Sequence, residues 1–313
     1  MGKGKTQPVA KLIDTARLRM RTQPLGALLA LGAACVLAAC QTAGFPSLPS
    51  LPSLPNPNIA AEGETTRYAA SPDNIASLSD VVQRNPNDPQ AYNVRGSVYG
   101  QAGRYQEALG DFNKAISLDP NFAQAYANRG LIHRQTNRLD LAFADYNKAI
   151  ALDPNYSVAY LGRGIIYRQR KQALNAFNDF NKAIAMRPDS AQGYYNRGLL
   201  YQGQRQYQYA IDDFSTAIGL SPNEAEPYIA RGQSYIAVRD YKAAAGDLDN
   251  AVAADPQNIQ AWTNRGLAYE RMGDKERAAG SYAKAMGINK DYEPAKAGFN
   301  RVGGQFGQSY ETN

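Results

Sequence analysis

The chain has 313 residues, and its 34 Lys and Arg residues against 28 Asp and Glu residues give a formal net charge of +6. Six of the basic side chains but only one acidic side chain lie in residues 1–39, which leaves 28 basic and 27 acidic residues in the rest. Because the excess positive charge is confined to this first segment, the rest lacks the basic surface that binds phosphate backbones, and no nucleic-acid partner is expected.

Residues 1–39 have the pattern of a secretory signal. A basic stretch ending at Arg21 precedes an apolar run from Pro24 to Ala39, which is shorter than the roughly 20 residues of a membrane-spanning helix. The run ends in Leu37-Ala38-Ala39-Cys40, which resembles the lipobox of bacterial lipoproteins. The resemblance implies cleavage before Cys40 and acylation of its sulfur, so that lipid would anchor the chain to a membrane.

Three alternatives remain open for this segment. It could be an uncleaved signal anchor in which the cysteine is incidental. Met1-Gly2 with Thr6 fits the pattern for N-myristoylation, which the export signal that follows disfavours. Residues 20–39 alone form a compact signal, so Met1 and Met20 are both candidate starts.

The cysteines also bear on compartment and chemistry. Cys35 would be removed with the signal and Cys40 would be acylated, which leaves no thiol pair for a disulfide, a Cys-ligated zinc site or thiol catalysis. Gln41 follows the lipobox, and by the enterobacterial sorting pattern it favours the outer membrane. We therefore expect a lipid-anchored, periplasm-facing protein of a Gram-negative cell envelope.

Residues 40–71 are predicted to form the lipidated N-terminus and a linker. Within residues 44–58 a proline recurs at every third position, which favours polyproline II and a reach of roughly 40 Å at about 3.1 Å per residue. The segment is thus interpreted as a stiff spacer above the membrane. A docking site for a proline-reading partner is the alternative.

A 34-residue period begins beyond the linker. Prolines recur at Pro86, Pro120, Pro154, Pro188, Pro222 and Pro256. An Arg-Gly pair keeps the same step at Arg95-Gly96, Arg129-Gly130, Arg163-Gly164, Arg197-Gly198, Arg231-Gly232 and Arg265-Gly266. A fixed period of this length predicts a solenoid.

The pattern resembles the tetratricopeptide repeat (TPR). If the first repeat begins at Pro89, its fourth position is aromatic, its eighth is glycine and its twentieth is alanine in all six repeats. The twenty-fourth position holds Phe112, Tyr146, Phe180, Phe214, Leu248 and Tyr282. The resemblance covers residues 89–292 and implies an all-α, right-handed superhelical solenoid of six helix pairs. Arg at position seven, and Lys290 where a seventh proline would fall, depart from the family pattern.

The residues support this assignment independently. In the first repeat Tyr105, Ala108, Leu109 and Phe112 follow the spacing of an amphipathic helix, and Asp119-Pro120 ends it. The asparagines or aspartate after the prolines are predicted to cap the next helices: Asn87, Asn121, Asn155, Asp189 and Asn223. Capping helices are expected in residues 72–88 and 293–304, followed by a flexible tail in residues 305–313.

No catalytic, metal or cofactor site is predicted, and the chain is not expected to be an enzyme. His133 replaces the tyrosine of its sibling repeats and is interpreted as a packing residue. The periodic arginines and the periodic Asp111, Asp145, Asp179, Asp213 and Asp247 are expected to pair between helices; a functional charged groove is the alternative. No Ser/His/Asp set, phosphate loop or metal-ligand cluster lies outside this periodicity.

In TPR proteins the first helices line a concave groove, mainly through positions 2, 5, 9, 12 and 13. Carried to this chain, the resemblance predicts a peptide-binding groove formed by Leu131, Arg134, Leu161, Ile165, Arg168, Tyr195, Leu199, Ile229, Ile236 and Leu267. Alternatively, several of these side chains merely pack between repeats. No expected first helix contains lysine, which disfavours the binding of chaperone C-terminal carboxylates.

In its architecture the chain resembles the NlpI-type TPR lipoproteins, which tether peptidoglycan hydrolases to a carboxyl-terminal processing protease. The resemblance implies a scaffold that binds envelope proteins or their peptide segments. A pilotin-like lipoprotein that serves secretion or pilus assembly is the main alternative, and a cell-wall hydrolase is the enzymatic one. The oligomeric state is not predicted.

Overall fold

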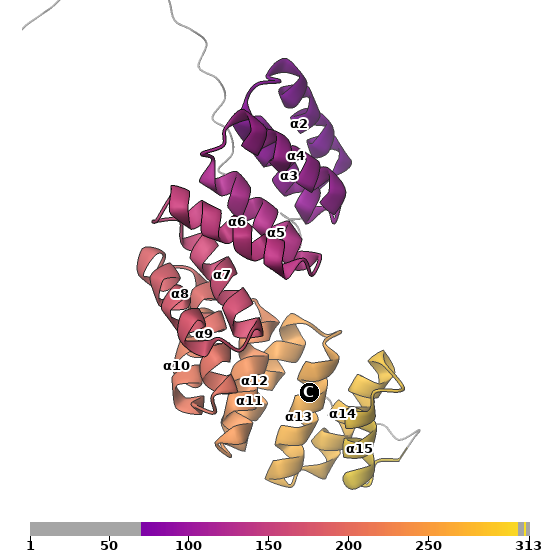
Figure 1. The fold of residues 1–313 in the computed structure, drawn as a ribbon. Helices are drawn as coiled ribbons and strands as arrows, with labels where there is room; N and C mark the ends of the chain where they lie inside the picture. Colours follow the sequence, from indigo (N-terminus) through magenta and orange to yellow (C-terminus); the bar gives the residue numbers. More distant parts are fainter. Residues whose placement is uncertain (1–69, 306–309, 311–313) are drawn as a thin grey trace, which may run out of the picture. The chain divides into compact units, whose positions relative to one another are not determined.

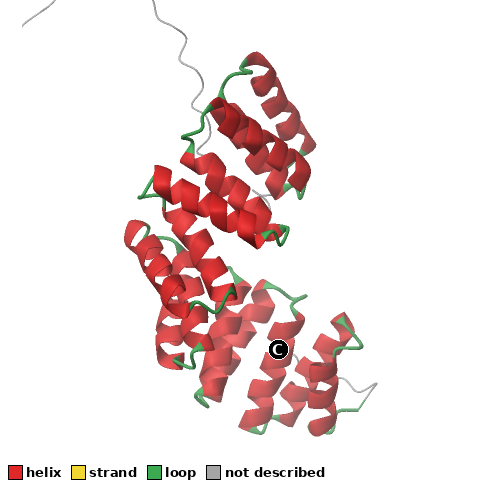
Figure 2. Ribbon diagram, in the orientation of Figure 1, coloured by secondary structure: helices red, strands yellow, loops and turns green. Residues whose placement is uncertain are grey.

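The computed structural model describes residues 70–305 and Tyr310 (Figure 1). The predicted signal in residues 1–39, the lipidation site Cys40, nearly all of the linker and most of the tail lie outside these residues. The described part contains fourteen α-helices, α2–α15, and no strand (Figure 2). None of these helices is long and apolar enough to cross a bilayer.

Twelve of the helices form six pairs, each within one 34-residue repeat. The first helices are α3 (Pro89–Gln101), α5 (Ala123–Gln135), α7 (Ser157–Gln169), α9 (Ala191–Gly203), α11 (Ala225–Ala237) and α13 (Ile259–Met272). The second helices are α4 (Tyr105–Leu118), α6 (Leu139–Leu152), α8 (Ala173–Met186), α10 (Tyr207–Leu220), α12 (Tyr241–Ala254) and α14 (Lys275–Ile288). The capping helices are α2 (Pro72–Arg84) and α15 (Glu293–Arg301).

The helices pack in chain order, which confirms the predicted solenoid. Each second helix contacts the first helix of its own repeat and the first helix of the next. The contacts between alternate helices join first helices, from α3 to α5 and onward to α13. The first helices therefore form one continuous row of neighbours.

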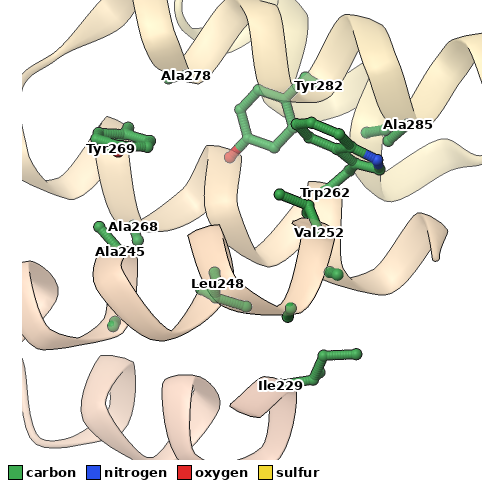
Figure 3. Close-up of a cluster of buried hydrophobic side chains, with 14 of the residues drawn as sticks. Ile229, Ala245, Leu248, Val252, Trp262, Ala268, Tyr269, Ala278, Tyr282 and Ala285 are labelled. Atoms are coloured by element: carbon green, nitrogen blue, oxygen red, sulfur yellow. The ribbon is translucent and has the colours of Figure 1, made fainter. Parts of the chain in front are cut away.

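Small residues allow the two helices of a pair to approach closely, as their positions in the sequence suggest. A Cβ at Gly164 would lie 2.7 Å from Cε1 of Phe180, which is below any normal contact distance. Ala176, at the twentieth position of the same repeat, is fully buried. The largest hydrophobic cluster, which includes Leu248 of α12 and Tyr282 of α14, is drawn in Figure 3.

The predicted capping by the residues after the prolines is wrong. The Pro-Asn pair forms the turn, so the helix begins two residues after the asparagine, and Phe122 and Tyr156 occupy the N-cap positions of α5 and α7 without a side-chain cap. The loop is held by the preceding aspartate instead, since Asp119 Oδ1 accepts a hydrogen bond of 2.9 Å from the Asn121 amide. Asp88 caps α3 and Asn258 caps α13.

Candidate peptide-binding surface

The periodic arginines and aspartates pair between helices in five repeats, as the sequence predicts. Arg163 donates from Nε and Nη2 to the two carboxylate oxygens of Asp179, each at 2.8 Å, and Asp179 is 4% exposed. The aspartate raises the pKa of Arg163 through this hydrogen bond, although burial opposes it. The five pairs are Arg95–Asp111, Arg129–Asp145, Arg163–Asp179, Arg197–Asp213 and Arg231–Asp247.

Each of these arginines also reaches a third helix. Arg163 donates from Nη1 to Asn147 on the preceding second helix at 2.8 Å, and Arg231 donates likewise to Ser215. One guanidinium therefore joins its own helix, its paired second helix and the second helix of the repeat before. This arrangement uses the guanidinium groups of the position-7 arginines within the fold.

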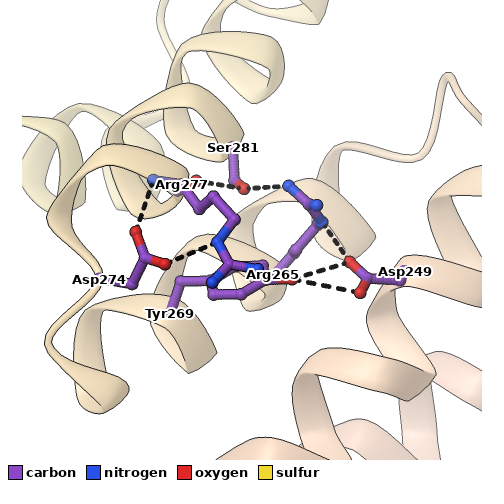
Figure 4. Close-up of polar contacts among 6 residues, drawn as sticks. All are labelled: Asp249, Arg265, Tyr269, Asp274, Arg277 and Ser281. Carbon is purple, nitrogen blue, oxygen red and sulfur yellow. Dashed lines mark hydrogen bonds and ion pairs between the residues drawn. The ribbon is translucent and has the colours of Figure 1, made fainter. Parts of the chain in front are cut away.

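The sixth repeat departs from the predicted pairing. Ser281 stands where the other repeats have aspartate, and Arg265 donates from Nη1 to its hydroxyl at 2.8 Å (Figure 4). The carboxylate comes instead from Asp249 of the preceding repeat, 2.6 Å from Nε. Because the acidic residue has moved to the other neighbouring helix, Arg265 keeps a counter-charge while being only 2% exposed.

His133 lies half-buried against the Arg129–Asp145 pair. Its Nε2 is 3.8 Å from Asp145 Oδ2, and its buried Nδ1 has no hydrogen-bond partner among the described residues. Burial lowers the pKa of the imidazole more than Asp145 raises it. Within the described ranges no three His, Cys, Asp or Glu side chains are grouped as metal ligands would be.

We define the first-helix surface as the side chains at positions 2, 5, 9, 12 and 13 of the first helices. Position 9 contributes a row of apolar side chains that are neither fully buried nor fully exposed: Leu131, Ile165, Leu199 and Leu267. Tyr195 and Ile236 are half-buried too. Since consecutive first helices are in contact, these side chains lie on neighbouring elements.

Two residues predicted for the groove belong to the core instead. Leu161 is 9% exposed and packs in a cluster with Leu200, and Ile229 is 5% exposed and packs in the cluster that contains Leu248. Position 5 points between neighbouring helices in these repeats, so a large apolar side chain there is covered. Both side chains are thus largely covered by the fold.

Asparagines on the first helices also serve the fold. Asn93 and Asn128 are 1% and 6% exposed, and Asn128 Nδ2 donates to Asn93 Oδ1 at 2.9 Å. Asn128 Nδ2 also lies 3.3 Å from the Ser97 hydroxyl. These contacts tie α3 to α5.

Arg134 and Arg168 occupy position 12 of α5 and α7, and neither forms an ion pair with a described carboxylate. The Nε of each is buried and has no hydrogen-bond acceptor in the described part of the chain. Burial lowers the pKa of Arg168, and the charge of Arg134 adds to this effect, whereas Tyr195 opposes it.

The sequence analysis missed the role of Tyr146, a buried tyrosine of α6. Burial raises the pKa of its phenol, and the charge of Arg134 opposes that shift. A Cβ at Gly162 would overlap the ring of Tyr146, so the phenol passes over α7 only because residue 162 is glycine. The sequence could have indicated this contact, because tyrosine at position 24 of one repeat is followed by glycine at position 6 of the next repeat. Phe214 at the same position is instead followed by Ala230.

The charge of the first-helix surface changes sign across α9. Burial raises the pKa of Tyr195, Glu226 of α11 raises it further, and Arg168 lowers it. Burial also raises the pKa of the neighbouring Glu224, and Glu226 adds to the shift. The surface is therefore positive at α5 and α7 and negative at α11.

Tetratricopeptide repeat models match three stretches that together cover about two thirds of the chain. They are residues 75–157 and 229–293, with a further match over residues 164–224. The chain belongs to the tetratricopeptide repeat family. TPR domains generally act as non-catalytic scaffolds for protein–protein interaction. The comparison with curated proteins found no match.

Solved TPR structures share the fold at low sequence identity. A chain in the structure of the APC/C hetero-tetramer Cut9–Hcn1 is 20% identical to this one, with a TM-score of 0.69, over 77% of this chain and 47% of that one. This TPR protein therefore spans about half the length of that relative. PilF of Pseudomonas aeruginosa is 20% identical with a TM-score of 0.61, over 69% and 97% of the two chains. A TPR protein from Parabacteroides merdae is 22% identical with a TM-score of 0.53, over 73% and 90%.

Proposed function

We propose that this TPR protein is a lipid-anchored scaffold of the bacterial envelope, which binds peptide segments of envelope proteins on its first-helix surface. The row of apolar side chains at position 9 carries the proposal. Leu131, Ile165 and Leu199 lie on three consecutive first helices and are not fully covered by the fold. An apolar strip bordered by polar groups suits an extended or helical peptide.

The anchor is proposed from the sequence pattern that ends at Cys40. Acylation there would hold the repeats at the membrane and raise the local concentration of any two partners that bind together. By analogy with NlpI-type lipoproteins, the partners would be peptidoglycan hydrolases and a processing protease. The purified chain itself is expected to have no activity on peptidoglycan.

The lipid anchor is tested by labelling cells with radioactive palmitate. The full chain should incorporate label and sediment with membranes, and Cys40→Ala should abolish both because it removes the acylated sulfur. Cys35→Ala is the matched control, since that residue precedes the proposed cleavage point. Label that persists in Cys40→Ala would contradict lipidation at this residue.

The partners are tested by immobilising the full chain in mild detergent and passing detergent-solubilised envelope over it. Mass spectrometry should identify a processing protease together with peptidoglycan hydrolases among the retained proteins. If secretion or pilus components were retained instead, the pilotin-like role would be favoured over the scaffold role.

The first-helix surface is tested with the double variant Leu131→Gln and Leu199→Gln. Glutamine is chosen because the fifth repeat already has it at position 9, as Gln233. Capture of the partners should be lost because the apolar strip is interrupted. Gln233→Glu, a polar change at the same position of another repeat, should retain capture. Retained capture by the double variant, with an unchanged circular-dichroism spectrum and melting curve, would remove the strip from the proposal.

A further inference from the structure

Arg134 and Arg168 differ from the other half-buried arginines on the first helices in having no counter-charge. The arginines at position 7 each contact a carboxylate within 3 Å, such as Arg163 with Asp179 at 2.8 Å. Arg134 and Arg168 each keep a buried Nε without an acceptor among the described residues. A guanidinium nitrogen that is removed from water without an acceptor is destabilising, so the fold alone does not explain these two Nε groups.

The sixth repeat shows how a charge at position 12 is satisfied elsewhere in the same fold. Glu270 occupies that position on α13, and both of its carboxylate oxygens accept hydrogen bonds of 2.9 Å from Arg301 of α15. The hydroxyl of Tyr282 donates to Glu270 Oε2 at 2.6 Å. The charge at position 12 thus meets an opposite charge from position 9 of the following helix.

In the second and third repeats the following helix offers no such charge. The residues that correspond to Arg301 are Ile165 for Arg134 and Leu199 for Arg168, and both are apolar. Tyr146 stands at the same repeat position as Tyr282, and the charge of Arg134 lowers the pKa of its phenol against the effect of burial. Ile165 and Leu199 fill the positions that correspond to Arg301 without supplying a charge, so a counter-charge for Arg134 and Arg168 would have to come from a ligand.

We propose that Arg134 and Arg168 bind the side-chain carboxylate of an acidic residue within a bound peptide, whose neighbouring apolar side chains rest on Leu131, Ile165 and Leu199. The proposal rests on the peptide-binding function proposed above and names the chemistry of the segment. Position 9 lies one helical turn from position 12 on the same face, so the acidic and apolar contacts are adjacent. Arginine pairs bind carboxylates through charge-assisted hydrogen bonds.

The negative end of the first-helix surface limits the peptide further. Glu226 acts on the hydroxyl of Tyr195 from the side opposite Arg168. A second acidic residue that extended toward α11 would be repelled there. The preferred segment therefore carries its acidic residue at α5 and α7 and neutral or basic residues toward α11.

The test uses the full chain in mild detergent and two pools of short fluorescein-labelled peptides. Both pools vary Ala, Leu, Val and Phe around one fixed central residue, which is Glu in one pool and Gln in the other. Fluorescence anisotropy at low ionic strength measures binding. The Glu pool should bind roughly tenfold more tightly than the Gln pool, because only its central side chain carries a carboxylate.

Arg134→Gln with Arg168→Gln should remove the preference for Glu and leave binding of the Gln pool unchanged. The urea midpoint of this double variant should equal or exceed that of the parent, because two unpaired, partly buried charges are removed. Arg205→Gln with Arg239→Gln, two exposed turn residues, is the control for net charge and should keep the preference.

The outcomes separate this proposal from the one on which it rests. Equal binding of both pools would overturn the carboxylate site while leaving peptide binding in place. A preference for Glu that survives in the arginine double variant would also overturn it. Binding of neither pool would overturn both proposals, and a lowered urea midpoint in the double variant would assign the arginines to the fold.

Discussion

At the scale of single residues, the contact between Tyr146 and Gly162 links the core to the first-helix surface. We expect Gly162→Ala to destabilise the protein by about 1–3 kcal/mol, because the added Cβ would overlap the Tyr146 ring. Gly246→Ala, in α12 where a Cβ would meet nothing within 4 Å, should be stabilising by roughly 0.5–1 kcal/mol. Urea unfolding followed by circular dichroism measures both changes.

The double variant of this pair gives a second measurement. Tyr146→Phe should recover part of the stability lost in Gly162→Ala, because a ring without the hydroxyl can adopt the placement of Phe214, which shares a buried cluster with Ala230. Additive effects of the two substitutions would show that the hydroxyl does not hold the ring over residue 162.

His133 makes stability depend on pH in a direction that can be worked out. Burial lowers the pKa of the folded imidazole below its unfolded value of about 6.5, so the folded state binds fewer protons. The stability that the neutral imidazole allows is fully present above the unfolded pKa of about 6.5. It is lost as the pH falls through the lower pKa of the folded state. His133→Tyr, which restores the residue of the sibling repeats, should therefore lose less stability than the parent between about pH 8 and pH 5.

Urea unfolding across this range measures the difference, and the chain has no second histidine to obscure it. The imidazole resonances of the folded parent should titrate below pH 6.5. An identical pH dependence of parent and variant would mean that burial does not disfavour the charged form.

At the scale of helices, the Arg–Asp pairs are expected to stabilise the junction of three elements. Asp179→Ala should cost about 2–4 kcal/mol, because it leaves Arg163, with 18% of its side chain exposed, without its carboxylate. Replacing both partners by Arg163→Met and Asp179→Leu should cost less, since no unpaired charge remains. The free energy of unfolding in urea distinguishes the two cases.

The surface pair Arg104–Glu107 is the control for this comparison. Both side chains are 46% exposed, so solvent already screens their attraction. Glu107→Ala should leave the urea midpoint within error of the parent. If Glu107→Ala lowered the free energy of unfolding as much as Asp179→Ala, burial would not explain why the Arg163–Asp179 pair stabilises the fold.

Features that recur every 34 residues could be predicted from the sequence. Features that depend on the neighbours of a single repeat could not. The helix pairs, the buried Gly164 contact and the Arg163–Asp179 pair recur, so periodicity identifies them. The transfer of the Arg265 counter-charge to Asp249 depends on the single serine at position 281. The burial of Leu161 depends on how two adjacent helices pack, which periodicity does not specify.

At the scale of the whole repeat array, buried hydrophobic residues are distributed unevenly. One cluster runs from Ala225 of α11 to Phe299 of α15, whereas the earlier repeats contain separate, smaller clusters. The stability of a repeat protein is approximately the sum of the stabilities of its repeats and of the interfaces between neighbours. A substitution in a terminal helix should therefore destabilise only the repeats that share contacts with that helix. The C-terminal repeats should thus respond together to the loss of their cap.

Phe299→Ala tests this expectation. The side chain is 2% exposed, and α15 contacts both α13 and α14, so its truncation should cost roughly 3 kcal/mol locally. Amide hydrogen exchange should accelerate in α12–α15 and remain unchanged in α5–α8, whose buried residues lie in other clusters. Asn300→Ala, an exposed change on the same helix, should leave exchange as in the parent. Uniform acceleration from α3 to α15 would instead show that the array unfolds as a single unit, in which case the cap would determine the stability of the first-helix surface as well.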